Sequence, residues 1–151
     1  MKALVVRQPW ASLIADGPKR VETRSRRTSY RGPLLLVAGC STAELNLPGP
    51  LWDQQHLPRG VALAVIELLD CRRMTPADAE AACCAFRPDL WAWLLGEPRR
   101  VERLPVRGMP GLFTPPPGPW EGRPAQPPLP TGETGFTAED AEDAEKKGER
   151  T

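Results

Sequence analysis

Two apolar runs constrain the fold of this 151-residue sequence more than any other feature. Residues 34–38 read Leu-Leu-Leu-Val-Ala, and residues 61–69 read Val-Ala-Leu-Ala-Val-Ile-Glu-Leu-Leu. The first run is short and does not alternate, which is typical of a strand that is buried on both faces. The second could form a helix by pattern alone, but three of its nine residues are β-branched and Gly60 precedes it. We therefore expect a strand in both places.

Shorter elements surround these two runs. Lys2–Val6 predicts a strand, and a helix of about two turns is expected to begin at Pro9 and to end at Gly17. A second helix is expected from Thr75, which suits a helix cap, to about Phe86. Residues 19–24, 90–95 and 99–106 predict further strands. Because strands and helices do not alternate regularly, the pattern predicts the α+β class, as a small β-barrel with two or three short helices.

The composition changes at Thr114. Eight prolines lie between Pro115 and Pro130, and an acidic end with the repeat AEDAEDAEK follows. Such a segment cannot bury enough apolar surface to offset the entropy of ordering it. We expect one folded domain at residues 1–113 and a Pro-rich, acidic, disordered tail at residues 114–151. Trp120 or Phe136 could pin part of this tail to the domain, although neither residue predicts that by itself.

The domain is basic, whereas the tail is acidic. Residues 1–113 hold sixteen Lys and Arg against eleven Asp and Glu, and residues 138–150 hold six acids against three bases. Six of the basic residues lie within thirteen positions that contain a single acid, Glu22: Lys19, Arg20, Arg24, Arg26, Arg27 and Arg31. A cluster of this kind favours a phosphate-bearing partner.

Several other kinds of site are not indicated. The single histidine, His56, and the four cysteines lack the spacing of metal sites, so we expect no metal. Cys83 and Cys84 fall in a stretch that predicts a helix, where small buried side chains are the simplest interpretation. The N-terminus lacks the apolar core of a signal peptide, and no apolar run is long enough to span a membrane. We expect a cytoplasmic protein with reduced thiols.

The segment Gly17-Pro-Lys19-x-x-Glu22-x-Arg24 is the first candidate site. In an extended strand Glu22 and Arg24 share a face, whereas Lys19 joins them only if it still belongs to the preceding turn. If the three converge, Glu22 would hold both cations and leave a net positive site for a phosphate or a planar base edge. The alternative is a solvated, charged strand in which Glu22 only offsets its neighbours.

Residues on either side of this segment could extend the site. Trp10 shares the apolar face of its helix, so its ring could pack in the core or stack on a base. Gln8 could tie down a backbone group at the helix start or read a base edge. Arginines also flank Tyr30, as in proteins that bind single-stranded nucleic acid, and these arginines are Arg26, Arg27 and Arg31.

These motifs together resemble the ASCH domain family, whose compact β-barrel is related to the PUA fold of RNA-modifying enzymes. The matching motifs span nearly all of residues 2–113 and are QPW at Gln8–Trp10, G-x-K-x-x-E-x-R at Gly17–Arg24, Tyr30-Arg31-Gly32, GVALAVIE at Gly60–Glu67 and PVRGMPGLF at Pro105–Phe113. The resemblance implies a cationic cleft between the first helix and the barrel that binds RNA or another nucleic acid. Lys19, Glu22 and Arg24 would line this cleft, with Gln8 and Trp10 near its mouth.

The resemblance also suggests an enzymatic alternative. A small bacterial branch of the family hydrolyses the acetyl amide of acetylated cytidine with a lysine, a threonine and a glutamate. Lys19 matches that lysine, but Glu22 occupies the position of the threonine. Thr23 is adjacent, yet one step along a strand reverses the direction of a side chain. If the protein is an enzyme, Lys19 and Glu22 are its candidate catalytic residues, with Lys19 as a possible base for another hydrolysis, including that of RNA.

A third alternative is a protein partner that docks on the Trp-rich strand at residues 90–95 or on the Pro-rich tail. Trp91 and Trp93 would share one face of that strand, and core packing is the simpler interpretation for both. Our principal hypothesis is a monomeric, single-domain protein of the bacterial type that binds RNA or a nucleotide-containing ligand without a cofactor. Its binding residues would be Gln8, Trp10, Lys19, Glu22, Arg24, Arg26, Arg27 and Arg31.

Overall fold

The computed structural model describes residues 1–41 and 57–121 of the chain. These described residues belong to one compact unit. The expected tail from residue 122 onward, with Phe136, lies outside the described residues, as does His56.

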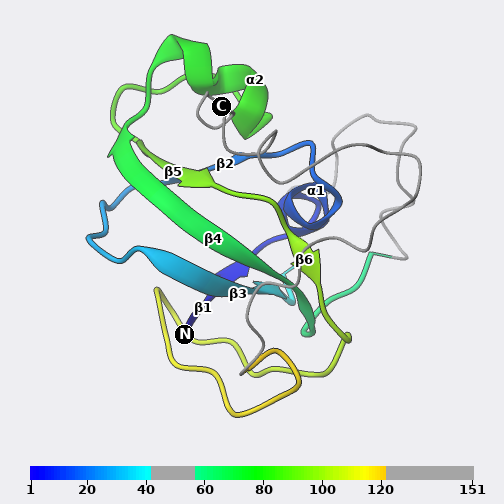
Figure 1. Cartoon of the computed structure of the whole chain (residues 1–151). Coiled ribbons are helices and arrows are strands. Elements are labelled where there is room, and N and C mark those ends of the chain that lie inside the picture. Colours follow the sequence, from blue (N-terminus) through cyan, green and yellow to red (C-terminus); the bar gives the residue numbers. More distant parts are fainter. Residues whose placement is uncertain (42–56, 122–151) are drawn as a thin grey trace, which may run out of the picture. The chain divides into compact units, whose positions relative to one another are not determined.

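Within the described residues, six strands form one curled, half-open barrel (Figure 1). Five of them lie in the order β1-β3-β4-β5-β2, and the sixth, β6, pairs with β4. The strands are β1 (Lys2–Val6), β2 (Val21–Arg24), β3 (Gly32–Ala38), β4 (Ala62–Arg73), β5 (Trp91–Leu95) and β6 (Arg99–Arg100). The pair β1–β3 is parallel, and the other pairs are antiparallel. This arrangement confirms the α+β class and the expectation of a small barrel with short helices.

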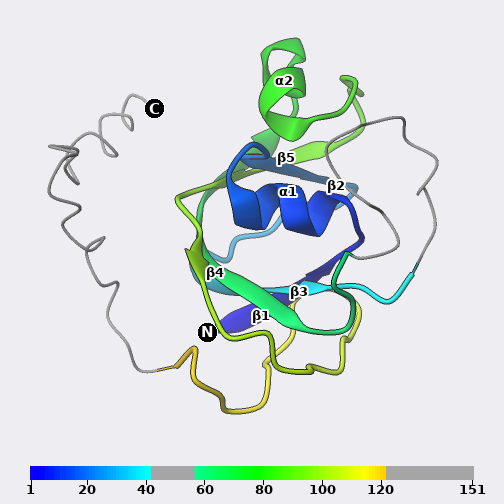
Figure 2. The same ribbon diagram turned by 90° about the vertical axis from the view of Figure 1, so that its right-hand side faces the viewer.

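Helix α1 (Trp10–Asp16) lies against the hollow side of the curled sheet (Figure 2). Its buried residues Ala11, Ile14 and Ala15 pack with strand residues in the larger apolar cluster. The helix ends at Gly17, which has a φ of 111° and whose N–H donates to the carbonyls of Leu13 and Ile14. Glycine adopts this left-handed backbone without steric penalty, so the predicted stop is confirmed.

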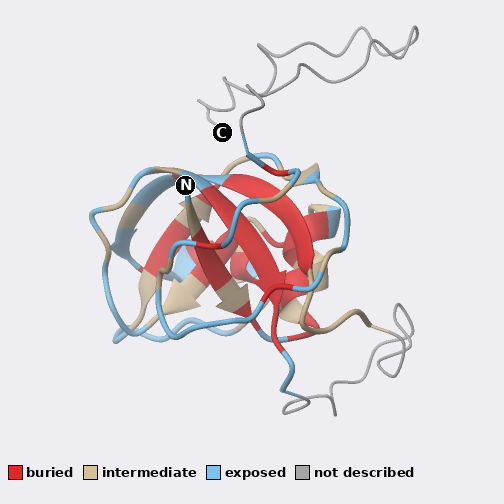
Figure 3. Cartoon of the chain, turned by 90° about the horizontal axis from the view of Figure 1, so that it is seen from below, coloured by how far each residue is buried: buried red, intermediate tan, exposed pale blue. Residues whose placement is uncertain are grey.

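Strand β3 is buried on both faces, as its sequence predicts. Leu34 and Leu36 belong to the cluster beneath α1, whereas Leu35 and Val37 belong to a second cluster on the other face of the sheet. The buried strands form the centre of this compact unit in Figure 3. Successive residues of a strand point to opposite faces, so an unbroken apolar run supplies both layers at once.

The second helical region is shorter than the sequence predicts. Thr75 and Asp78 form the predicted capping arrangement around a 3₁₀ turn at Pro76–Asp78, but the helix that follows, α2, covers only Ala79–Ala82. The Arg20 N–H donates to the Ala81 carbonyl at 2.8 Å, and the Lys19 ammonium donates to the Ala82 carbonyl. Because these donors occupy carbonyls that a longer helix would use, the expected extension to Phe86 was wrong.

The chain leaves α2 through Cys83, whose φ of 57° is left-handed. Cys83 and Cys84 are both half-buried, so the expectation that they are buried within a helix was also wrong.

The last expected strand, residues 99–106, is also shorter in the structure. Only β6 is a strand, and an isolated bridge joins Pro105 to Val61. Between them the Leu104 N–H donates to the Glu102 carbonyl, which forms a turn and interrupts the ladder. Strand β4, in contrast, continues past Asp70 because its second half pairs with β5.

The compact unit continues beyond the expected domain end at residue 113. Trp120 is 2% exposed and packs in the second cluster with Leu35, Val37 and Val106. A buried indole contributes a large apolar area, and this one closes the side of the sheet opposite α1. The described unit therefore includes the chain up to Glu121.

Replacing Trp120 with Ala should destabilise the full-length chain by about 3 kcal/mol, because it removes a large buried side chain from the second cluster. Urea denaturation followed by far-UV circular dichroism measures the change. The matched control is Met109→Ala, at a side chain that is 52% exposed, for which we expect a change of at most about 0.5 kcal/mol. Equal stability of the two variants would show that Trp120 is not part of the folded core.

Candidate functional site

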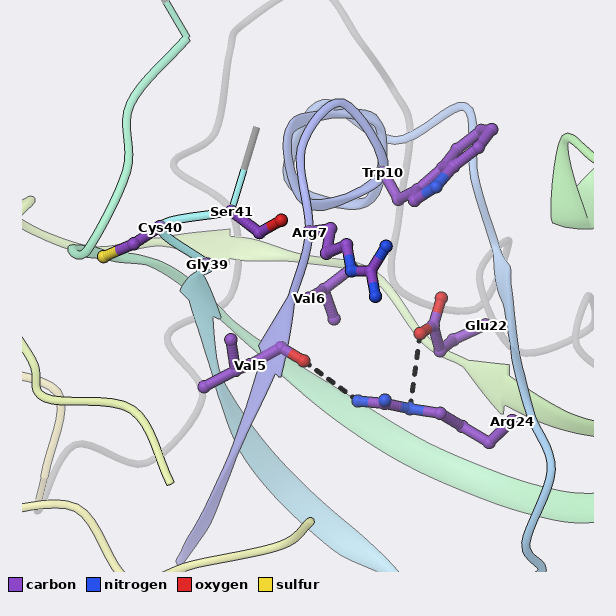
Figure 4. Close-up of a pocket in the computed structure, with 9 residues that line it drawn as sticks. All are labelled: Val5, Val6, Arg7, Trp10, Glu22, Arg24, Gly39, Cys40 and Ser41. Atoms are coloured by element: carbon purple, nitrogen blue, oxygen red, sulfur yellow. Dashed lines mark hydrogen bonds and ion pairs between the residues drawn. The ribbon is translucent and has the colours of Figure 1, made fainter. Parts of the chain in front are cut away.

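The two edge strands of the sheet, β1 and β2, do not pair with each other. Arg24 of β2 spans the opening between them, where its Nη2 donates to the Val5 carbonyl of β1 at 2.9 Å. A pocket of about 400 Å³ lies at this opening (Figure 4). Its lining residues come from both edge strands, from α1 and from the end of β3, and they are Val5, Val6, Arg7, Trp10, Glu22, Arg24, Gly39, Cys40 and Ser41.

Glu22 is the acidic group of this pocket, and it is only 7% exposed. Its Oε1 lies 3.8 Å from Lys19 Nζ, and its Oε2 lies 3.4 Å from Arg24 Nε. Burial raises the pKa of the Glu22 carboxyl above its ordinary value of 4.5, while the charges of Lys19 and Arg24 lower it by less. Glu22 therefore accepts a proton more readily than a solvated glutamate does.

Lys19 lies in the turn between α1 and β2, which is the condition for its convergence with Glu22. The side chain is buried, and its ammonium donates to the Ala82 carbonyl and lies 5.3 Å from the centre of the Trp10 ring. Lys19 is not among the lining residues. It acts from behind Glu22, where it holds the carboxylate and the indole ring in place.

Gln8 does not line the pocket either. Its amide is fully buried, and its Nε2 donates to Ser12 Oγ and to the Pro58 carbonyl, both at 2.8 Å. Its Oε1 accepts the Ser12 N–H at 2.9 Å. Of the two roles that the sequence leaves open, the structure shows the one that ties down the helix start.

The three other arginines of the sequence-based hypothesis lie outside the pocket lining. Arg26 and Arg27 are exposed in the loop between β2 and β3. Arg31 donates to the carbonyls of Thr28 and Tyr30 and pairs with Asp70 at 3.3 Å. Arg26 and Arg27 closely follow the strand that carries Arg24, so they contribute charge near the pocket without lining it, whereas Asp70 offsets the charge of Arg31.

Thr23 points away from Glu22. It pairs with Ala92 of β5, and its hydroxyl lies 3.9 Å from the Cys84 sulfur. Glu22 and Arg24 are on the opposite face of β2, as the period of two along a strand requires. The threonine next to the candidate lysine and glutamate therefore does not reach the pocket.

The two tryptophans of β5 pack as their simpler interpretation predicts. Trp93 is buried in the larger cluster, and its Nε1 donates to the Arg26 carbonyl at 3.1 Å. Trp91 is half-buried against the same cluster. The Arg24 guanidinium carbon lies 5.8 Å from the centre of the Trp93 ring, so an indole also borders the inner side of the pocket arginine.

The sequence-based hypothesis missed the far wall of the pocket, which Val6, Arg7 and residues 39–41 form. These residues directly follow or end β1 and β3, which run parallel, so their carboxyl ends meet at one edge. Ligand sites commonly lie beyond the carboxyl ends of parallel strands. The apolar segments at residues 3–6 and 34–38 are each followed directly by residues of this wall. The sequence does not show that the two segments pair in parallel, so it could not predict that these residues meet.

Within the described residues, no group of three or more His, Cys, Asp or Glu side chains has an arrangement that could hold a metal ion. In the same ranges, none of the helices has the length and apolar character that a membrane crossing requires.

Comparison with known proteins decides the family, because the ASCH domain model matches residues 4–105. The chain belongs to the ASCH domain family. Among curated proteins, this ASCH domain is 36% identical over 127 residues to activating signal cointegrator 1 of Homo sapiens. It is 27% identical over 127 residues to the Mus musculus protein of the same name. The matched region covers 73% of this chain but only 21% of either relative, so the chain spans about a fifth of their length.

Two solved structures of the ZmASCH protein from Zymomonas mobilis are also similar. The variant with tyrosine replaced by phenylalanine gives a TM-score of 0.47 at 11% identity, covering 69% of this chain and 74% of that one. The variant with serine replaced by alanine gives a TM-score of 0.44 at 12% identity, covering 69% of this chain and 72% of that one.

Glu22 should make the stability of this ASCH domain depend on pH. The pKa of Glu22 is higher in the folded than in the unfolded chain, so the folded state binds this proton more tightly. As pH rises from about 4.5, the wild type should therefore lose stability relative to Glu22→Gln, by up to about 1.4 kcal/mol per pH unit. The loss should end once pH exceeds the raised pKa.

Urea unfolding of both proteins from about pH 4 to about pH 8 measures this difference. The comparison between the two proteins cancels the titration of all other groups. A wild type that gains stability relative to Glu22→Gln as pH rises would show that the pairing with Lys19 and Arg24 outweighs burial.

Proposed function

We propose that this ASCH domain binds RNA and that its pocket takes one unpaired base of a single strand. The observation that carries the proposal is the meeting of an indole ring, a buried carboxylate and a guanidinium in one opening: Trp10, Glu22 and Arg24. These groups supply stacking, hydrogen-bond acceptance and phosphate neutralisation, which are the three interactions that recognition of single-stranded RNA uses.

The size of the pocket supports a small, planar guest. A volume of about 400 Å³ is within the range of small-ligand sites and is suited to a nucleoside rather than to a folded partner. The walls combine apolar groups, such as Val5 and Val6, with a few polar ones. Such a lining suits a base, which has apolar faces and polar edges.

Glu22 favours a base that presents hydrogen-bond donors. A carboxylate accepts hydrogen bonds from an exocyclic amine such as the N4 group of cytosine. Lys19 lies beside one carboxylate oxygen of Glu22, and Arg24 lies beside the other. These two contacts restrict the directions from which Glu22 can accept a hydrogen bond from a ligand. The Arg24 side chain is 32% exposed, so its guanidinium is also within reach of a phosphate.

The alternative of a protein partner on residues 90–95 has less support. Trp93 is buried in the core, and Trp91 is half-buried with the Arg73 guanidinium carbon 4.3 Å from its ring centre. Protein interfaces usually depend on aromatic residues that a partner can cover. Neither tryptophan presents a bare apolar surface of that kind.

Arg24 should supply a phosphate contact. In a titration with fluorescent single-stranded RNA at low salt, Arg24→Gln should weaken binding about tenfold. It should also reduce the slope of log affinity against log salt by about 0.7, the value for one phosphate contact on a single strand. Arg103→Gln, at an exposed arginine that does not line the pocket, is the control with the same change of charge.

Trp10 should act through stacking instead. Trp10→Leu should weaken the same RNA by about fivefold or more while leaving the salt slope unchanged, because stacking releases no counterions. Circular dichroism and thermal melting confirm that each variant is folded. If both Arg24→Gln and Trp10→Leu bind RNA as the wild type does, the pocket is not the binding site.

Hydrolysis of acetylated cytidine is the competing function, and a direct assay separates it from binding. We expect acetylated cytidine to remain intact after prolonged incubation with the protein, because Thr23 faces away from the pocket and Lys19 is committed to Glu22 and Ala82. Chromatography that detects cytidine or acetate is the measurement. Turnover that Lys19→Ala abolishes would contradict the binding-only function.

A further inference from the structure

We propose a second nucleic-acid contact outside the pocket, formed by Arg27, Arg73 and Trp91, which binds the sugar-phosphate backbone of the strand whose base enters the pocket. We call these three residues the Trp91 platform. This inference rests on the proposed function for the identity of its partner. The geometry of the platform, however, is independent of the pocket, because none of its residues is among the lining residues.

The register of the sheet connects the platform to the pocket. Arg24 of β2 pairs with Trp91 of β5, and Trp91 pairs with Arg73 of β4. Directly paired residues of neighbouring strands point to the same face, so these three form one row across the sheet. Adjacent strands are about 4.8 Å apart, and the row therefore extends about 10 Å from the pocket arginine. Strands β2, β5 and β4 are neighbours in Figure 1.

The Trp91 ring lies close to two guanidinium groups. The Arg73 guanidinium carbon lies 4.3 Å from the ring centre, and that of Arg27 lies 6.0 Å from it. Both distances are within the range of a cation–π contact. The two arginines come from different elements, β4 and the loop after β2, and both approach the same ring.

Acidic side chains neutralise Arg31 and Arg72, two neighbouring arginines, but not Arg27 and Arg73. Arg31 pairs with Asp70 at 3.3 Å, and Arg72 pairs with Asp78 at 2.8 Å. In residues 1–41 and 57–121, no Asp or Glu forms an ion pair with Arg27 or Arg73. Both charges border one ring, so an anion that binds beside this ring is attracted by both.

The loop that carries Arg27 is already fixed. Trp93 Nε1 donates to the Arg26 carbonyl at 3.1 Å, which anchors the backbone next to Arg27. An arginine that is positioned before binding loses less conformational entropy when it contacts a ligand. The platform is therefore prepared for a phosphate, and the planar guanidinium groups next to the indole also suit a neighbouring base or ribose.

A single nucleic-acid strand fits this surface better than an acidic peptide does. The row begins at Arg24, which also lines the pocket, so one continuous ligand can meet both sites. Phosphates match the charges of the guanidinium groups along the row, and flat bases match their planar faces. An acidic peptide offers the charges without the flat groups.

The experiment compares two probes on matched variants. The probes are a fluorescent single-stranded RNA of about twelve nucleotides and a single nucleoside monophosphate, both at low salt. The test variant combines Arg27→Gln with Arg73→Gln, and the control combines Arg103→Gln with Arg107→Gln, which removes the same charge at two other exposed arginines. Thermal melting checks that both variants are folded.

We expect the test variant to bind the longer RNA at least about tenfold more weakly, with a salt slope smaller by about 1.4, and to bind the mononucleotide as the wild type does. A third variant, Arg27→Lys with Arg73→Lys, should restore the salt slope. Equal effects of the test and control variants on the longer RNA would overturn the platform. An equally large loss of mononucleotide binding in the test variant would overturn it as well.

The two proposals fail in different ways. If Arg24→Gln and Trp10→Leu leave both probes unaffected while the test variant weakens the longer RNA, the pocket function is wrong and the platform stands. If the test variant has no effect while Arg24→Gln weakens both probes, the pocket stands and the platform is wrong. If a glutamate-rich peptide of the same length displaces the RNA at equal concentration, the assignment of the platform to nucleic acid is overturned.

Discussion

The opening between the edge strands β1 and β2 is the constraint on which the other features depend. A closed barrel would satisfy both edges by backbone pairing, but here the Arg24 side chain donates to the Val5 carbonyl instead. Helix α1 fills the space inside the curl with Ala11, Ile14 and Ala15. The opening thus leaves a pocket whose walls belong to stable elements, and a guanidinium stands where a backbone hydrogen bond would otherwise lie.

The charged groups at this opening do not account for the stability of the fold. Burial raises the pKa of Glu22 despite the two cations nearby. The free-energy cost of desolvating the carboxylate therefore exceeds the favourable electrostatic interaction with Lys19 and Arg24. Two apolar clusters, one on each face of β3, supply the favourable burial instead. A ligand that donates hydrogen bonds to Glu22 would favour its ionised form, so binding would lower the pKa of Glu22.

Local patterns predict much of this structure, and long-range contacts explain what they miss. The unbroken apolar run at residues 34–38 predicted a strand buried on both faces, and the period of two placed Glu22 beside Arg24. The second helix could not be sized from sequence, because donors from Lys19 and Arg20 end it. The pocket wall at residues 39–41 depends on the parallel pairing of β1 with β3, which no local pattern encodes.

The acid inside the pocket also explains why phosphate contacts are expected outside it. An ionised Glu22 repels a phosphate that enters the pocket, whereas it attracts the donor groups of a base. A nucleotide would therefore enter with its base toward Glu22 and with its phosphate toward solvent, near Arg24. The next phosphate of the strand then needs a cation that no acid has neutralised. Arg27 and Arg73, held by Trp91 in the same row of the sheet as Arg24, meet that requirement.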